Sequence, residues 1–181
     1  GINAGGWTTI STTLPVNQWF HVLATWDGTT MKLYVNGGTP VTASKTGTIT
    51  YTSNNTTIGK NSTLSGFEWD GKISNVAIYN SGLTSSQVST LFNFGTPETN
   101  ISFSPQAWWK LDDQTAITDS SNNGNTGTNN AATDATTSVA VVPSWKIPSA
   151  LPITTANYTT ALDFDGSNYI DIAYDTSLNL G

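Results

Sequence analysis

The feature that most constrains this chain is the recurrence of Asp-Gly and Asn-Gly dipeptides between short segments of alternating polarity. Both dipeptides adopt positive φ at low cost and are the strongest short-range signals of a β-hairpin. Lys72–Tyr79, for example, follows Asp70-Gly71 and alternates between two faces. The pattern predicts an all-β fold. Its strands are expected at residues 19–26, 31–35, 48–51, 56–58, 72–79 and 107–111, and a hairpin around Asp165-Gly166 at residues 162–172.

One short helix is expected among these strands. Thr84 and Gln87 have the spacing of a capping box, in which the hydroxyl bonds the third amide and the Gln side chain reaches back. Apolar residues then follow at helical spacing. Gly95 is expected to cap the C-terminal end, and Pro97 prevents continuation.

The charge balance excludes several classes of partner. The 181 residues include twelve Asp and Glu against six Lys and no Arg, which gives a net charge of −6. Nucleic acid and polybasic membrane contacts need clustered basic residues, so neither is expected. No apolar run approaches the roughly 18 residues of a membrane span. Cys is absent, so no disulfide or thiolate metal site can form.

Two ordered sets of motifs resemble the laminin-G-like, concanavalin A-like β-sandwich family. The resemblance implies an antiparallel jelly-roll β-sandwich with one short helix. Similar domains occur in arrays in secreted bacterial proteins and in virion proteins of marine phages, which implies an extracellular or virion-surface location. The set that resembles the closing part of the family comprises Trp19–Val22, Thr25–Gly28, Leu33–Gly37, Gly71–Tyr79 and Leu83–Val88. The set that resembles its opening strands comprises Ala107–Asp113, Asp119–Gly127 and Leu162–Gly166.

The closing set precedes the opening set, which determines the expected domain organisation. Residues 1–96 are predicted to be the C-terminal portion of a sandwich, 97–106 a linker and 107–181 the N-terminal portion. The family motifs begin again after a linker that has Pro near each end. This order favours a chain that spans the boundary between two repeats of a tandem array. The halves could also complete one sandwich in permuted order, or with another chain. Residues 129–160 are weakly patterned and longer than an ordinary loop.

The inventory of acid–base residues argues against catalysis. The chain has one His and two Glu. Glycosidases on similar sandwiches use paired carboxylates, but Glu68 and Glu98 are far apart in the sequence. The adjacent pairs, Asp112 with Asp113 and Asp163 with Asp165, are read as turn and hairpin carboxylates, and His21 as a packed strand residue. No catalytic residue is therefore predicted.

A calcium site is the most specific chemical hypothesis. Ca²⁺ takes six to eight oxygen ligands from carboxylates, amides and carbonyls. The loop at residues 119–127 supplies Asp119, Asn122 and Asn125, and Asp113 on the adjoining segment adds a second carboxylate. The family resemblance supports an ion here. The alternative is an Asx-rich turn held by its own backbone bonds, and the sequence does not choose between them.

Glycan binding is the activity that the resemblance implies. Sugar sites combine an exposed aromatic ring with polar groups, and Trp69, Trp7 and Trp145 lie in loop-like contexts. Packing over a sandwich edge is the alternative for each ring. The expected function is a non-catalytic module for glycan binding or adhesion at a cell or virion surface. The alternatives are a fibre or capsid-decoration repeat completed by neighbouring subunits as a homo-oligomer and, least favoured, a degenerate glycosidase-like enzyme.

Overall fold

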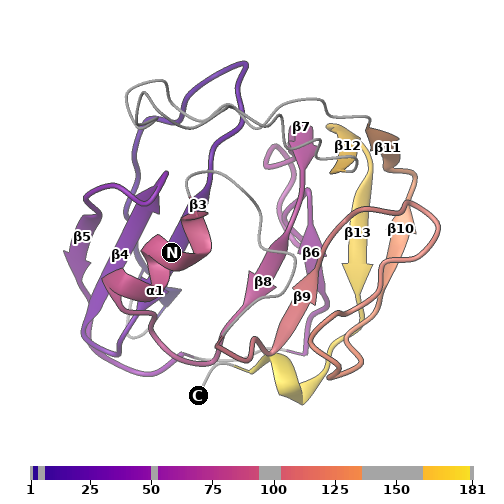
Figure 1. Cartoon of the computed structure of the whole chain (residues 1–181). Coiled ribbons are helices and arrows are strands. Elements are labelled where there is room, and N and C mark those ends of the chain that lie inside the picture. Colours follow the sequence, from indigo (N-terminus) through magenta and orange to yellow (C-terminus); the bar gives the residue numbers. More distant parts are fainter. Residues whose placement is uncertain (1, 4–6, 50–52, 94–102, 136–160, 180–181) are drawn as a thin grey trace.

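The computed structural model describes residues 2–3, 7–49, 53–93, 103–135 and 161–179, which form short antiparallel strands and one α-helix (Figure 1). The all-β prediction with a single short helix is confirmed. The first strands are β1 (Ile2–Asn3), β2 (Trp7–Thr8), β3 (Val22–Trp26), β4 (Thr30–Val35), β5 (Val41–Ser44), β6 (Thr56–Ile58), β7 (Asp70–Ile73) and β8 (Val76–Ile78). After the helix α1 (Ser85–Phe92) come β9 (Ala107–Trp109), β10 (Gly127–Asn130), β11 (Thr133–Ala135), β12 (Ala161–Asp165), β13 (Tyr169–Ile172) and the 3₁₀ turn η3 (Thr176–Leu178).

The strands β3, β4 and β5 form a three-stranded meander. The turn between β3 and β4 is the predicted Asp-Gly turn. Asp27 Oδ1 accepts hydrogen bonds from the Thr29 and Thr30 amides at 3.0 and 2.8 Å, and Gly28 has φ +88°. The next strand was misplaced, because β5 forms at Val41–Ser44 and residues 48 and 49 are not in a strand. The position of β5 is set by its register with β4, in which Val41 of β5 lies opposite Leu33 of β4.

The helix α1 begins as predicted and ends earlier. The Thr84 hydroxyl accepts from the Gln87 amide at 3.3 Å, and the Gln87 side chain accepts from the Thr84 amide at 2.8 Å. The C-cap is Asn93 with φ 39°, and the expected Gly95 lies outside the described residues. Asn tolerates the left-handed region, so it ends the helix without Gly. Val88 of α1 packs against Tyr34 of β4 and Leu83 in a small core of its own.

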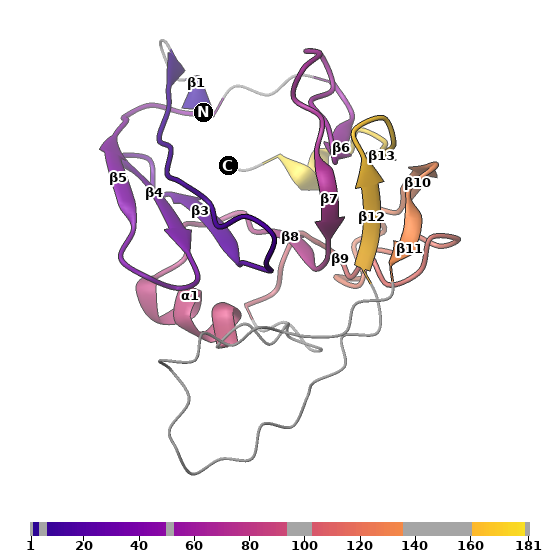
Figure 2. The ribbon, with the colours of Figure 1, turned by 90° about the horizontal axis from the view of Figure 1, so that it is seen from above.

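A larger core lies on the other side of the molecule, where β10, β13 and β6 form one sheet and β11, β12 and β7 form another (Figure 2). The interior faces of both sheets contribute to one cluster. Trp109 and Phe164 are its largest fully buried residues. Trp108 is buried, whereas Trp19 and Trp26 are only partly buried. The buried members of the larger core are Ile58, Ala107, Trp109, Leu111, Ile117, Ala132, Leu162, Phe164, Ile170 and Ile172.

Strands from the two sides of the predicted linker pair within this one chain. Ile58 of β6 lies opposite Ile170 of β13, and β7 pairs with β12. Val76 of β8 lies opposite Trp109 of β9. The larger core therefore draws on both predicted parts. The boundaries at 1–96, 97–106 and 107–181, and the origin of this order, stay predictions.

One other expectation about a strand is corrected. The strand expected at residues 72–79 is broken into β7 and β8 by Ser74 and Asn75, the latter with φ 53°. The backbone amide of Asn75 donates to the Lys110 carbonyl, and the side-chain oxygen of Asn75 accepts from Trp108 Nε1 at 3.0 Å. These two hydrogen bonds hold the chain at the break between the strands. Within the weakly patterned residues 129–160, β10 ends and β11 forms, and residues 136–160 lie outside the described part of the chain.

Candidate functional site

An open hollow lies in the segment between β6 and β7. It is shallow, with a volume of about 390 Å³. Its wall combines aromatic rings, an amide, one acidic and one basic side chain, and it includes the predicted Trp69. The lining residues are Gly59, Lys60, Asn61, Phe67, Glu68, Trp69 and Ile73.

Trp69 is held in place by its backbone and by one neighbouring ring. Its amide donates to the Gly59 carbonyl at 2.7 Å, and its carbonyl accepts from the Gly166 amide at 3.1 Å. Phe20 contacts the indole edge-on, with ring centroids 6.4 Å apart. The residue nevertheless stays 38% exposed. Trp69 is thus a fixed, partly exposed aromatic ring at the edge of a hollow.

The other predicted aromatic candidates cannot be placed at this hollow. Trp7 lies in β2, opposite Asn3 of β1, and its side chain is outside the described structure. Trp145 lies entirely outside the described residues. The proposal for these two Trp residues stays a prediction.

The polar groups of the hollow were not predicted from the sequence. Asn61 Oδ1 accepts from the Thr63 and Leu64 amides, both at 2.9 Å, which shapes the loop and leaves the amide nitrogen for other contacts. The Lys60 ammonium lies 3.0 Å from the centroid of the Tyr169 ring. The available signal was the run Gly66-Phe67-Glu68-Trp69, in which an acidic residue stands between two aromatic residues in a polar segment.

The predicted calcium loop is held together by hydrogen bonds around Asp119. One oxygen of Asp119 accepts from the Trp108 and Ser121 amides, at 3.0 and 2.8 Å. The other accepts from the amide and the side chain of Asn125, at 3.0 and 3.2 Å. Partial burial acts to raise the pKa of Asp119, but the hydrogen bonds from Ser121, Trp108 and Asn125 outweigh it and hold the pKa below its ordinary value.

The four predicted calcium ligands are only partly brought together. Asn125 is buried, and it contacts Asp119 and accepts from the Ser177 hydroxyl at 3.0 Å. Asp113 sits in its own turn, where Oδ1 accepts from the Thr115 amide and hydroxyl at 2.7 and 2.6 Å. Asn122 occupies the left-handed region with φ 70°. In the described part of the chain no three His, Asp or Glu side chains converge as metal ligands. These contacts are those of the alternative, an Asx-rich turn held by its own hydrogen bonds. Calcium binding stays a prediction.

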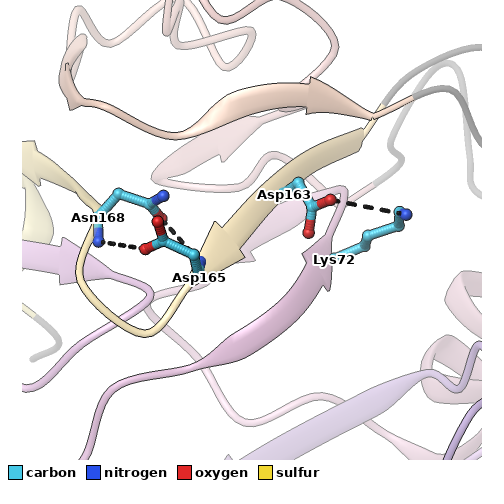
Figure 3. A network of polar contacts seen from close by, with 4 residues as sticks. All are labelled: Lys72, Asp163, Asp165 and Asn168. Carbon is cyan, nitrogen blue, oxygen red and sulfur yellow. Dashed lines mark hydrogen bonds and ion pairs between the residues drawn. The ribbon is translucent and has the colours of Figure 1, made fainter.

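The carboxylates of β12 each have separate structural partners (Figure 3). Asp163 forms an ion pair with Lys72 of β7 at 3.7 Å. Asp165 accepts from the amides of Ser167 and Asn168, at 2.9 and 3.2 Å, in the hairpin turn. Hydrogen bonds from Ser167 and Asn168 lower the pKa of Asp165. These contacts fit the reading of Asp163 and Asp165 as hairpin carboxylates.

Two buried polar atoms, His21 Nδ1 and the Tyr79 hydroxyl, lack a hydrogen-bond partner in the described structure. The His21 ring packs beside Phe92 of α1 at a centroid distance of 5.9 Å, and desolvation lowers the pKa of His21 below 6.5. Burial also raises the pKa of Tyr79 to about 12. Both residues are thus uncharged at neutral pH, and neither lines the hollow.

We expect the stability of the protein to fall as the pH drops below about 6.5. Below that pH the single His of the unfolded chain becomes protonated. In the folded chain His21 stays neutral until the pH reaches its lowered pKa, so protonation favours the unfolded state. A single proton gives a slope of at most about 1.4 kcal/mol per pH unit. Urea unfolding between pH 7.5 and pH 5 measures it, with His21→Gln as the control that removes the slope. A wild-type stability that is flat over this range would contradict the prediction.

Comparison with known proteins gives one match. Residues 1–89 match the family model described as the concanavalin A-like lectin/glucanases superfamily. Searches of curated proteins and of solved structures find no match to the chain. Among the described residues, no helix has the length and apolar character to cross a membrane. The match covers the motifs of β3, β4, β7, β8 and α1, and the all-β antiparallel architecture agrees with it. Residues 1–89 are therefore similar to the concanavalin A-like lectin and glucanase superfamily, in agreement with the laminin-G-like motifs that they contain.

Proposed function

We propose that this protein is a non-catalytic module that binds a glycan in the hollow beside Trp69. The observation that carries the proposal is the fixed, partly exposed Trp69 beside Asn61, Glu68 and Lys60, which line the same open space. An aromatic face stacks on the apolar face of a sugar ring, while polar groups bond its hydroxyls. The match of residues 1–89 to a family that contains lectins supports the same ligand class.

The open shape of the hollow supports adhesion over catalysis. Its described lining includes one carboxylic acid, Glu68, whereas glycosidases of the usual type place two carboxyl groups across the bond that they cut. The paired Asp residues of β12 have partners elsewhere. We therefore propose a role in attachment to a glycan-bearing surface, at the exterior of a cell or virion.

Replacing Trp69 by Ala is expected to weaken glycan binding at least tenfold, because Trp anchors in binding sites commonly contribute about 2 kcal/mol or more. A glycan array with the wild-type protein identifies the ligand, and calorimetric titration then compares the variants. Tyr174→Ala is the matched control, since Tyr174 is 40% exposed and is not among the lining residues. An array without hits, or equal affinity for the two variants, would overturn the proposal.

A further inference from the structure

The hollow is lined by two residues of opposite charge that do not pair with each other. Lys60 and Glu68 both line it, yet neither forms an ion pair within the described structure. The ion pair that is observed there joins Lys72 and Asp163, which do not line the hollow. Opposite charges at one site that leave each other unpaired are both available to a ligand.

The Lys60 ammonium packs on an aromatic ring, and the backbone around it is held by hydrogen bonds. It lies 3.0 Å from the centre of the Tyr169 ring, which attracts the cation without neutralising its charge. The Lys60 carbonyl accepts from the Thr57 hydroxyl at 2.9 Å, and the preceding Gly59 carbonyl accepts from the Trp69 amide. Because Lys60 lines the hollow, it places a positive charge beside it, which favours a carboxylate, phosphate or sulfate group.

Glu68 supplies the opposite preference from the same loop. It stands between Phe67, which is 65% exposed, and Trp69, and all three line the hollow. A carboxylate beside aromatic rings favours an ammonium group, through charge pairing and cation–π attraction. A ligand with only negative charge would be repelled by Glu68 and by the net charge of −6. A ligand with only positive charge would be repelled by Lys60.

On the basis of the proposed glycan-binding function, we propose that the ligand is a zwitterionic saccharide, with an ammonium group near Glu68 and an acidic group near Lys60. Four disaccharides test this, because they vary the two charges independently. Glucosaminyl-glucuronic acid carries both, N-acetylglucosaminyl-glucuronic acid only the acid, the glucosamine dimer only the amine, and the N-acetylglucosamine dimer neither. Titration at about pH 6 keeps the amine protonated and the acid ionised.

We expect each matching charge to tighten binding about two- to fivefold, as exposed ion pairs do. The zwitterionic disaccharide should therefore bind most tightly. Lys60→Gln should remove only the gain in affinity that the acidic group of the disaccharide provides. Glu68→Gln should remove only the gain that the amino group provides. Both changes lie in a loop; Glu68→Gln keeps the side-chain length and Lys60→Gln shortens it by one atom, and thermal unfolding confirms that each variant is folded. Tyr169→Phe, which keeps the ring, should retain the preference for the acid, whereas Tyr169→Leu should weaken it.

The two proposals fail in different ways. Equal affinity for the neutral and the zwitterionic disaccharide, or failure of all four to bind, would overturn the zwitterionic ligand. Glycan binding itself would still stand if the array gave hits that depend on Trp69. Loss of those hits as well would overturn both.

Discussion

Replacing Trp109 by Ala is expected to lower the free energy of unfolding by about 3–5 kcal/mol, as large-to-small changes of buried aromatic residues do. Trp109 is fully buried in the larger core, and its strand β9 pairs with β8 across the predicted linker. Its Nε1 also donates to the Asn125 carbonyl at 2.6 Å. The change thus removes packing, leaves a cavity and strands a buried carbonyl. Chemical denaturation followed by circular dichroism measures the loss.

Trp109→Phe separates the packing of the ring from its hydrogen bond. It keeps most of the buried ring and leaves the Asn125 carbonyl without this donor, which should cost about 1–3 kcal/mol. If Trp109→Ala costs no more than Trp109→Phe, the ring does not hold the sheets together, and the assignment of Trp109 to the larger core is wrong.

Gly59→Ala is expected to destabilise the protein by about 2–5 kcal/mol, through left-handed backbone strain and overpacking. Gly59 has φ +93°, and an added methyl would lie 2.5 Å from a carbon of the Phe164 ring. Phe164 is a fully buried residue of β12 and cannot move aside without disturbing the larger core. The Gly59 carbonyl also accepts a hydrogen bond from the Trp69 amide. Because the same change would disturb the position of Trp69, it should weaken glycan binding.

Gly28→Ala is the matched control for this clash. Gly28 has φ +88°, close to that of Gly59, but nothing lies within 4 Å of an added methyl. It should therefore show only the backbone strain, about 1–2 kcal/mol. Thermal unfolding of both variants measures the difference. Equal losses would mean that Phe164 yields to the methyl and that the packing around Gly59 is loose.

The parts of the fold that depend on near neighbours could be predicted from the sequence. The Asp27-Gly28 turn and the capping box at Thr84 involve residues two or three positions apart, and both are confirmed. The break at Asn75 was missed because it depends on Lys110 and Trp108, which are distant in the sequence. The strand β5 was missed because its position depends on register with β4 more than on its own alternation.

The candidate site shows the same division. Trp69 could be singled out because an aromatic residue in a polar loop is visible in the sequence. The contribution of Lys60 could not, because a charged loop residue is ordinarily solvated and its placement here depends on the folded loop. The contacts with Gly166 and Tyr169 come from the far end of the chain, and no local pattern identifies them.

The pairing of strands across the linker has a consequence for how the chain folds during synthesis. The meander of β3, β4 and β5 needs only neighbouring residues and can form early. The ladder of β6 with β13 closes a much longer loop, with Asn55 bonded to Asp171 at a separation of 116 residues. Such non-local pairings form slowly. The edges of β6 and β7 that pair with β13 and β12 therefore stay unpaired on the ribosome until the hairpin of β12 and β13 has emerged, and over that interval the nascent chain is most exposed to aggregation.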